Sequence, residues 1–315
     1  MIGYVIPHLT FEKNMRSIRF IAILIILPVF AANGFGAGNT GLAFLKLGAD
    51  AQTTAMGEVA AALSQNAAGL FWNPAGVAWM EARQVHFTHN EWIQGIDNEA
   101  LSVILPCSYG VVGVSAMLTN IGGIERRTTA TAEPLGEVSA QDFALGLSYA
   151  RKISSFLSAG LSAKLLNEKI YIDTATGYAI DLGLRYKVGE TGLYGGGALL
   201  NLGSMSALDE EKTRLPATLR LGFAWNVPFA FHSSEWLIGA DYVKVFDDES
   251  HINIGGQVGL SSMLSLRLGY QTNYDNRTVT AGFGLALGPL SLDYAYIPFD
   301  ADLGNSQRFT FLVDF

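Results

Sequence analysis

The chain has 315 residues, of which 50% are hydrophobic and only 15% are charged, and its mean hydropathy is +0.27. This composition is too apolar for an ordinary soluble surface, because soluble domains average about 25% charged residues. The net charge of −8 argues against a nucleic-acid-binding protein, which would need a basic face, and the single cysteine, Cys107, leaves no internal disulfide framework.

The N-terminus is typical of a secretory signal peptide. An apolar run from Phe20 to Ala32 follows Arg16 and Arg19, and small residues come next. The run is shorter than the roughly 20 residues of a comfortable transmembrane helix. We therefore interpret residues 1–36 as leader and signal peptide, with cleavage within residues 31–37. Met15 is an alternative start, since the residues before it add nothing that a signal peptide needs.

No later segment of the sequence has the length and hydropathy of a transmembrane helix, although the chain is exported and apolar. A closed β-barrel is the other structure that satisfies every backbone polar group inside a bilayer. The sequence therefore predicts an all-β fold, a membrane-spanning antiparallel barrel in the bacterial outer membrane. Its first partner would be the membrane lipid.

An alanine-rich stretch from Gln52 to Trp79 precedes the predicted strands. It begins with good helix formers and breaks at Asn73-Pro74-Ala75-Gly76. We interpret residues 37–82 as a partly helical plug inside a barrel formed by residues 83–315. The alternative is a short helix packed on a sheet edge. Asn73 precedes proline and is expected to be extended and to form an Asx-type turn, and Gly76 to have a positive φ or to approach the barrel wall closely.

Short segments that alternate large apolar with small or polar residues fill the rest of the chain. One example is Tyr178, Ile180, Leu182, Leu184 and Tyr186, which alternate with residues such as Asp181 and Gly183. A large apolar face is required against lipid and unfavourable against water. About fourteen such segments are centred near Phe87, Val103, Val114, Leu147, Leu161, Leu182, Ala198, Phe223, Ala240, Gly256, Leu268, Phe283, Asp293 and Phe311.

The predicted connections alternate in length, as in outer-membrane barrels with short periplasmic turns and longer external loops. Short ones include 107–109 and 288–289, and longer ones are expected at 120–140, 203–216 and 298–307. The last strand ends on Phe311, Val313 and Phe315, which resemble the signal recognised by the barrel-assembly machinery. An ordinary edge strand is the alternative, but an edge so apolar would invite aggregation.

The sequence offers little for catalysis or metal binding. His86 and His89 are three residues apart on a strand and point to opposite faces, while His232 and His251 fall in predicted turns. No serine lies in a Gly-x-Ser-x-Gly context. The Gly195-Gly196-Gly197 run is better interpreted as a strand whose glycines admit a plug than as a phosphate-binding loop. We expect no enzyme activity, no metal and no cofactor.

Five segments, in order, resemble the PorV/PorQ family of FadL-like outer-membrane barrels. They are Gly41–Gly48, Ala55–Glu58, Phe71–Gly76, His89–Trp92 and Leu215–Gly222. The resemblance implies a type IX secretion component that binds the C-terminal signal domains of cargo proteins. The alternative it implies is a FadL-like channel for hydrophobic small molecules, and a structural or assembly role stays open.

Two groups of candidate site residues follow from this resemblance. The plug motif consists of Met56, Gly57, Glu58, Phe71, Trp72, Asn73, Pro74, Ala75 and Gly76. The candidate binding cluster consists of His89, Asn90, Glu91 and Trp92, for which the simpler interpretation is a girdle tryptophan beside external polar residues.

Overall fold

A computed structural model describes residues 40–127, 133–208, 210–228, 234–246, 248–300 and 303–315, all within one compact unit, residues 36–315. The proposed leader and signal peptide, with His8, and also His232 lie outside the described residues. In the part of the chain that is described, no helix has the length and apolar character needed to cross a membrane.

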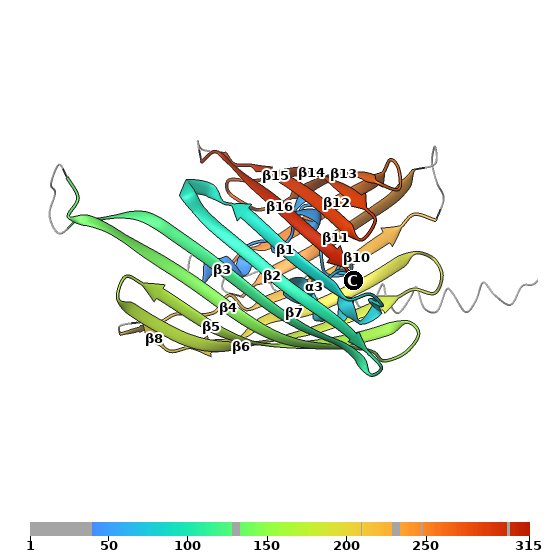
Figure 1. Ribbon diagram of the computed structural model, residues 1–315, viewed down its shortest axis with the longest axis horizontal. Coiled ribbons are helices and arrows are strands. Elements are labelled where there is room, and N and C mark those ends of the chain that lie inside the picture. The colour runs from blue at the N-terminus through green and yellow to red at the C-terminus, as the bar shows by residue number, and fades with distance from the viewer. Residues whose placement is uncertain (1–39, 128–132, 209, 229–233, 247, 301–302) are drawn as a thin grey trace, which may run out of the picture. The chain divides into compact units, whose positions relative to one another are not determined.

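Fourteen antiparallel strands close into one barrel (Figure 1), so the predicted fold class and strand number are confirmed. Each predicted segment centre falls within one of them. The strands are β1 (Gln84–Glu91), β2 (Ile96–Cys107), β3 (Gly110–Arg126), β4 (Gly136–Lys152), β5 (Leu157–Ile170), β6 (Asp173–Lys187), β7 (Leu193–Met205), β10 (Thr218–Asn226), β11 (Glu235–Val245), β12 (Ser250–Gly259), β13 (Leu264–Gln271), β14 (Val279–Leu287), β15 (Leu290–Pro298) and β16 (Asn305–Asp314). Closure occurs between β1 and β16, with Phe87 opposite Phe311.

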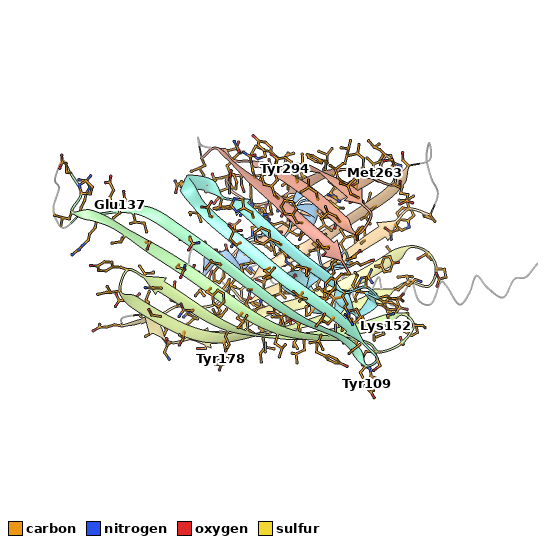
Figure 2. The ribbon with its side chains drawn as sticks, in the orientation of Figure 1. Tyr109, Glu137, Lys152, Tyr178, Met263 and Tyr294 are labelled. Atoms are coloured by element: carbon orange, nitrogen blue, oxygen red, sulfur yellow. The ribbon has the colours of Figure 1, made fainter. Side chains whose placement is uncertain are left out.

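The alternation of side chains follows the predicted register. Leu182, Leu184 and Leu268 are exposed on the outer wall, whereas Asp181 and Arg267 are buried in the lumen. Figure 2 shows Tyr178 pointing away from the barrel, in line with this outer face. A wall that is large and apolar outside and small or polar inside is what lipid requires.

Two ends of the barrel can be told apart. We call the end with connections 108–109, 153–156, 188–192, 227–234, 260–263 and 288–289 the turn end, and the opposite end the loop end. Tyr109 lies at the turn end and Glu137 at the loop end (Figure 2). The C-terminus lies at the turn end, because Phe315 N–H bonds to the Arg83 carbonyl.

The long loops expected from the sequence are shorter than predicted. β3 extends to Arg126 and β4 begins at Gly136, so most of the predicted loop 120–140 is a β-ribbon with a register shift between Ile121 and Ile124. The predicted loop 203–216 contains a two-stranded sheet, β8 (Ala207–Leu208) and β9 (Glu211–Lys212). Gly122 and Gly123 interrupt the alternation at the register shift, which hid the strand in the sequence.

The lumen is filled by the N-terminal segment, which confirms a partly helical plug. Its elements are η1 (Ala43–Lys46), α2 (Ala51–Ala55), α3 (Gly69–Trp72) and η2 (Pro74–Trp79). The alanine-rich stretch is less helical than its propensities suggest, because α2 ends at Ala55 and Gly57 and Glu58 are left-handed, with φ of 71° and 61°. The wall supplies the hydrogen bonds that a longer helix would have made.

Polar side chains of the wall bond to the backbone of the plug from several directions. Asp241 on β11 accepts from the Ala60 and Ala61 amides at 2.9 Å each. Further bonds join Ser102 to the Ala67 carbonyl, Ser158 to the Ala75 carbonyl, Arg185 to the Ala62 carbonyl, Thr280 to the Ala55 carbonyl and the Ala51 amide to Thr310. These partners lie on β2, β5, β6, β14 and β16, so the plug is fixed around most of the barrel circumference.

Glycines of the wall provide room for the plug. Of the predicted run, Gly196 lies against the plug, Gly197 lies near Leu221 of the adjacent strand, and Gly195 has open space around it. A side chain at Gly196 would collide with the Ala61 carbonyl, and one at Gly160 or Gly183 would collide with the turn at Asn73 to Ala75. Because the wall has glycines at these positions and the facing plug residues are small, the plug backbone lies directly against the strands.

Candidate functional site

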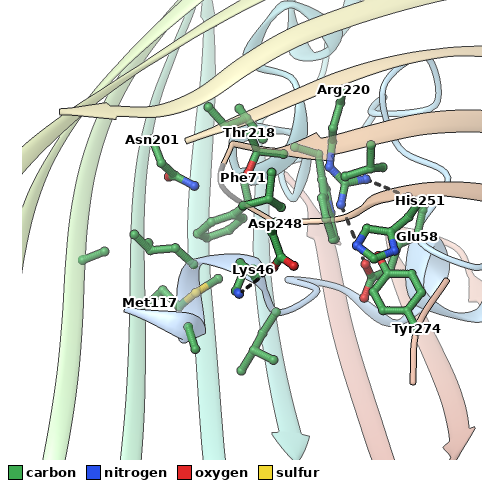
Figure 3. Close-up of a pocket in the computed structure, with 18 of the residues that line it drawn as sticks. Lys46, Glu58, Phe71, Met117, Asn201, Thr218, Arg220, Asp248, His251 and Tyr274 are labelled. Atoms are coloured by element: carbon green, nitrogen blue, oxygen red, sulfur yellow. Dashed lines mark hydrogen bonds and ion pairs between the residues drawn. The ribbon is translucent and has the colours of Figure 1, made fainter. Parts of the chain in front are cut away.

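A cavity of about 460 Å³ lies between the plug and the loop end of the barrel. It is lined by plug residues, by residues of β3, β4, β5, β7, β10, β11 and β12, and by residues of the outer connections. Asp248 and Tyr274 are two of these connection residues (Figure 3). Because it is concave, partly apolar and lined by several convergent polar groups, we take it as the candidate site.

Apolar side chains form one part of the lining. Leu45 and Leu47 come from the plug, Phe71 from α3, Met117 from β3 and Val243 from β11. Beside them, Leu42 and Phe44 are buried in a cluster with Met117, Leu166 and Met205. This part of the cavity can accept an apolar group from a ligand or partner.

The charged part of the lining is centred on Glu58, which is 2% exposed. Its carboxylate lies 3.7 Å from Arg220 and 3.4 Å from Arg277, and its backbone carbonyl accepts a 2.9 Å hydrogen bond from Arg220. Arg220 also lies 3.6 Å from Asp241. Two buried cations thus face two buried carboxylates, which removes most of the cost of burying either sign alone.

A second ion pair lies on the nearby strands β5 and β6. Lys164 Nζ is 2.7 Å from Asp181 and donates to Asn201 Oδ1 at 2.8 Å. Asn201 has φ of 60° at the register shift between β6 and β7, and its amide donates to Asp181. These contacts satisfy the polar groups exposed by the shift.

Aromatic rings surround Arg277 at the mouth. Its guanidinium lies 4.5 Å from the ring of Tyr274 and 5.6 Å from that of Trp92. Tyr274 stacks on His251 with ring centroids 3.9 Å apart, and Trp92 meets the edge of Phe299. Burial raises the pKa of the Tyr274 hydroxyl, and the nearby Glu58 carboxylate raises it further, so this phenol stays neutral.

The plug motif is divided between the cavity and the wall. Glu58, Phe71 and Trp72 line the cavity. Trp72 Nε1 donates to Asp50 at 2.7 Å, and Arg220 lies 4.5 Å from its ring. Met56 is packed against Gly255 of the wall instead, and Gly57 against backbone of Ile254 and Tyr270.

The Asn73 to Gly76 turn lies against β5 and β6, away from the cavity. Asn73 has φ of −155° and accepts from the Ala75 amide, so the predicted extended conformation and Asx-type turn are confirmed. Its amide group also donates to the Ala61 and Leu184 carbonyls. The expectation for Gly76 was wrong: it has no positive φ, and its close neighbour is the Ser64 backbone within the plug.

The candidate cluster at the end of β1 does not converge on one site. His89 and Glu91 are on the outer face, where His89 Nδ1 lies 2.7 Å from Glu99, whereas Asn90 is buried in the lumen and accepts from Ser306. Of the cluster, the cavity lining includes Trp92. Successive side chains on a strand point to opposite faces of the sheet, so residues that are adjacent in this sequence segment do not form one site.

The other candidate residues are also placed. His86 is buried in the lumen and His89 is on the opposite face, as the spacing predicted. The prediction for His251 was wrong, because it lies in β12 and not in a turn. Phe311, Val313 and Phe315 are exposed at the turn end of β16, and their part in assembly stays a prediction. Among the described residues, no three His, Cys, Asp or Glu side chains are grouped closely enough to hold a metal ion.

Sequence reasoning missed Arg220, Arg277 and Tyr274. Arg220 could have been singled out, because a charged residue on the inner face of a membrane strand is a functional candidate by default. Arg277 and Tyr274 come from a connection without periodicity, and nothing in the sequence places them over Glu58.

Comparisons with known proteins were made with both sequence and structure. A model of the family described as "Type IX secretion system protein PorV" matches residues 33–222. No curated protein sequence matches the chain.

Several solved structures have the same fold. The toluene transporter TodX of Pseudomonas putida is 14% identical, with 85% of this chain and 97% of that chain covered and a TM-score of 0.59. The Ralstonia pickettii toluene transporter TbuX is 13% identical, with 84% of this chain and 97% of that chain covered and a TM-score of 0.55. A Pseudomonas aeruginosa FadL homologue is 12% identical, with 90% of this chain and 99% of that chain covered and a TM-score of 0.57. At such identities the likeness establishes the fold alone.

Proposed function

The chain belongs to the PorV family, and on that premise we propose that it is a type IX secretion component that binds the C-terminal signal domains of secreted cargo. Its family and fold are those of outer-membrane transport barrels, and the outer membrane is its location. Short turns face the periplasm in such barrels, so the loop end, with the cavity, faces outward.

The attachment of the plug is the observation that carries this proposal. Passage through the lumen would require the plug to leave, yet its backbone is bonded to Asp241, Arg220, Ser102, Ser158 and Thr280 on five different strands. Each hydrogen bond to a charged group contributes about 1.5–3 kcal/mol. A plug bonded to the wall in this way favours binding over conduction.

Hydrophobic transport is the second candidate function. The apolar lining at Leu45, Leu47 and Met117 favours it, and two of the structures with this fold are named toluene transporters. A channel of this kind would need a route past the plug, whereas cargo binding needs none.

Adjacent residues on β4 provide a matched test. Ala144 lines the cavity, whereas its neighbour Leu145 faces lipid. Ala144→Trp should fill part of the cavity and weaken binding of a cargo C-terminal domain to the purified protein in lipid nanodiscs at least tenfold, while Leu145→Trp should leave binding unchanged. Uptake of toluene by cells provides the competing readout. The second function would be favoured over the first if the wild-type protein bound no cargo domain but supported toluene uptake, and if Ala144→Trp blocked that uptake.

A further inference from the structure

The Arg277 guanidinium joins the outer loops to the buried part of the plug, whereas a second ion pair, Lys46 with Asp248 at 3.5 Å, is more exposed. Arg277 belongs to the connection between β13 and β14, residues 272–278, which we call the latch loop. It contacts Tyr274 within that loop, Trp92 in the connection between β1 and β2, and Glu58 of the plug. The Arg277 side chain is 11% exposed and the Glu58 side chain 2%, so water screens the pair little.

The first residue of the latch loop is held by β12: the Thr272 amide donates to the Ile252 carbonyl, the Ile252 amide donates to Thr272 Oγ1, and His251 Nδ1 lies 3.2 Å from the Thr272 carbonyl. The Gln271 amide bonds to the Thr278 carbonyl at its base, and the Asp300 amide bonds to the Asn276 carbonyl from the connection between β15 and β16. Asn273 has φ of 60°, and its side chain donates to the Ser250 carbonyl. Tyr274 stacks on His251. Without Arg277, the loop would keep its base but would have no ionic contact with the plug.

The other half of the pair sits in an unfavourable backbone conformation. Gly57 and Glu58 are consecutive left-handed residues, and Glu58 carries a side chain that this region tolerates poorly. The conformation persists because Arg220 holds the carbonyl and Arg220 and Arg277 together hold the carboxylate. Ala60 and Ala61, two and three residues further on, are those bonded to Asp241. Loss of Arg277 would therefore loosen the part of the plug that forms the cavity floor.

We propose that the Glu58–Arg277 pair is a latch that couples the outer loops to the plug, so that a partner engaging Trp92 or Tyr274 loosens residues 57–61. Such a partner competes with Arg277 for the same aromatic faces and for the space at the cavity mouth. Coupling of this kind is reciprocal: whatever loosens the plug at Glu58 also loosens the latch loop. Only the identity of the partner, secreted cargo, rests on the proposed function.

Hydrogen exchange of the full-length protein in lipid nanodiscs tests the latch without any partner. Arg277→Gln should speed hydrogen exchange of the Asp300 amide and of the Ala60 and Ala61 amides by about tenfold. This factor assumes that the ion pair stabilises the closed state by more than an exposed pair does and by less than a buried pair does. Glu58→Gln should speed exchange in the latch loop although that loop is unchanged. The control is Lys187→Gln, which removes a turn-end pair with Glu190 and should change neither region.

The outcomes separate the latch from a local contact. Faster exchange in the latch loop alone, with Ala60 and Ala61 protected as in the wild type, would overturn the coupling. If Glu58→Gln fails to assemble, the Arg277→Gln result decides alone. A cargo domain added to the wild type should speed plug exchange as Arg277→Gln does. If the cargo domain does not bind, the proposed function is contradicted, and exchange in the two variants still decides whether the latch exists. If the cargo domain binds without altering exchange of the plug, coupling of the latch to cargo is refuted.

Discussion

The carboxylate of Asp241 provides the sharpest test of how the plug is held. Both of its plug contacts use Oδ2, which accepts from Ala60 and Ala61, and the same oxygen lies 3.6 Å from Arg220. In Asp241→Asn, the side chain can keep an oxygen toward these amides, but it loses the negative charge that offsets Arg220. Arg220 would then depend on Glu58 alone.

The expected loss follows from these contacts. Breaking a buried ion pair destabilises by about 3–5 kcal/mol, and hydrogen bonds to a charged group are stronger than neutral ones by about a factor of two. Because Glu58 still neutralises Arg220, we expect the lower end, about 3 kcal/mol. That corresponds to roughly a 100-fold faster exchange of the Ala60 and Ala61 amides, if the plug opens locally.

The control is a similar pair that does not hold the plug. Arg267 and Asp293 are paired across neighbouring parts of the wall, with oxygen and nitrogen 2.5 Å apart. Asp293→Asn should lower resistance to heat on gels but leave exchange at Ala60 and Ala61 near the wild-type rate. Asp241→Asn protein with unchanged exchange at both amides would refute the view that this carboxylate anchors the plug.

Three further predictions follow from the wall and the plug. Leu268→Arg, at a position 66% exposed on the outer wall, should cost about 2–4 kcal/mol in urea titrations of folding into lipid. Ser265→Arg, on the lumen face of the same strand, should not show this lipid penalty, and equal losses would contradict the register. Gly76→Val should disrupt the plug, since a side chain there meets the Ser64 backbone. Gly195→Ala, with open space around it, should assemble normally, and migration on gels with and without heating distinguishes the two variants. In a Cys107→Ser background, Glu249→Cys should react with an impermeant maleimide on intact cells and Gly288→Cys should not, and the reverse pattern would invert the orientation.

Strand positions were predictable because the bilayer imposes a simple rule on every strand. Leu182 and Leu184 must face lipid and Asp181 must not, so period-two alternation places both faces without knowledge of any partner. The rule fails where a strand leaves the membrane. Beyond Asn120 and Gln141, whose side chains bond to each other, most residues of the ribbon are exposed, and Gly122 and Gly123 break the alternation.

The path of the plug was much less predictable. Helix propensity favours a continuous helix after Gln52, but the wall offers Asp241 to the Ala60 and Ala61 amides, and these bonds can form only when the backbone turns at Gly57 and Glu58. Tertiary contacts thus override propensity. Alternation places Arg220 in the lumen, but its partner Glu58 is 162 residues away, and no local pattern encodes that distance.

The division of the plug motif indicates where specificity within this fold should lie. Met56, Gly57 and the turn from Asn73 to Gly76 contact the wall or the plug itself, and their small size or fixed backbone is explained by packing. Any protein that closes a barrel around such a plug needs these features, whatever it binds. Glu58 and Trp72 face the cavity, but both are already engaged by Arg220. A ligand or partner can instead contact the apolar lining, such as Leu45, or compete with Arg277 for the rings of Trp92 and Tyr274. Resemblance in the plug motif therefore identifies the scaffold, and substitutions at the cavity mouth should decide which partner is bound.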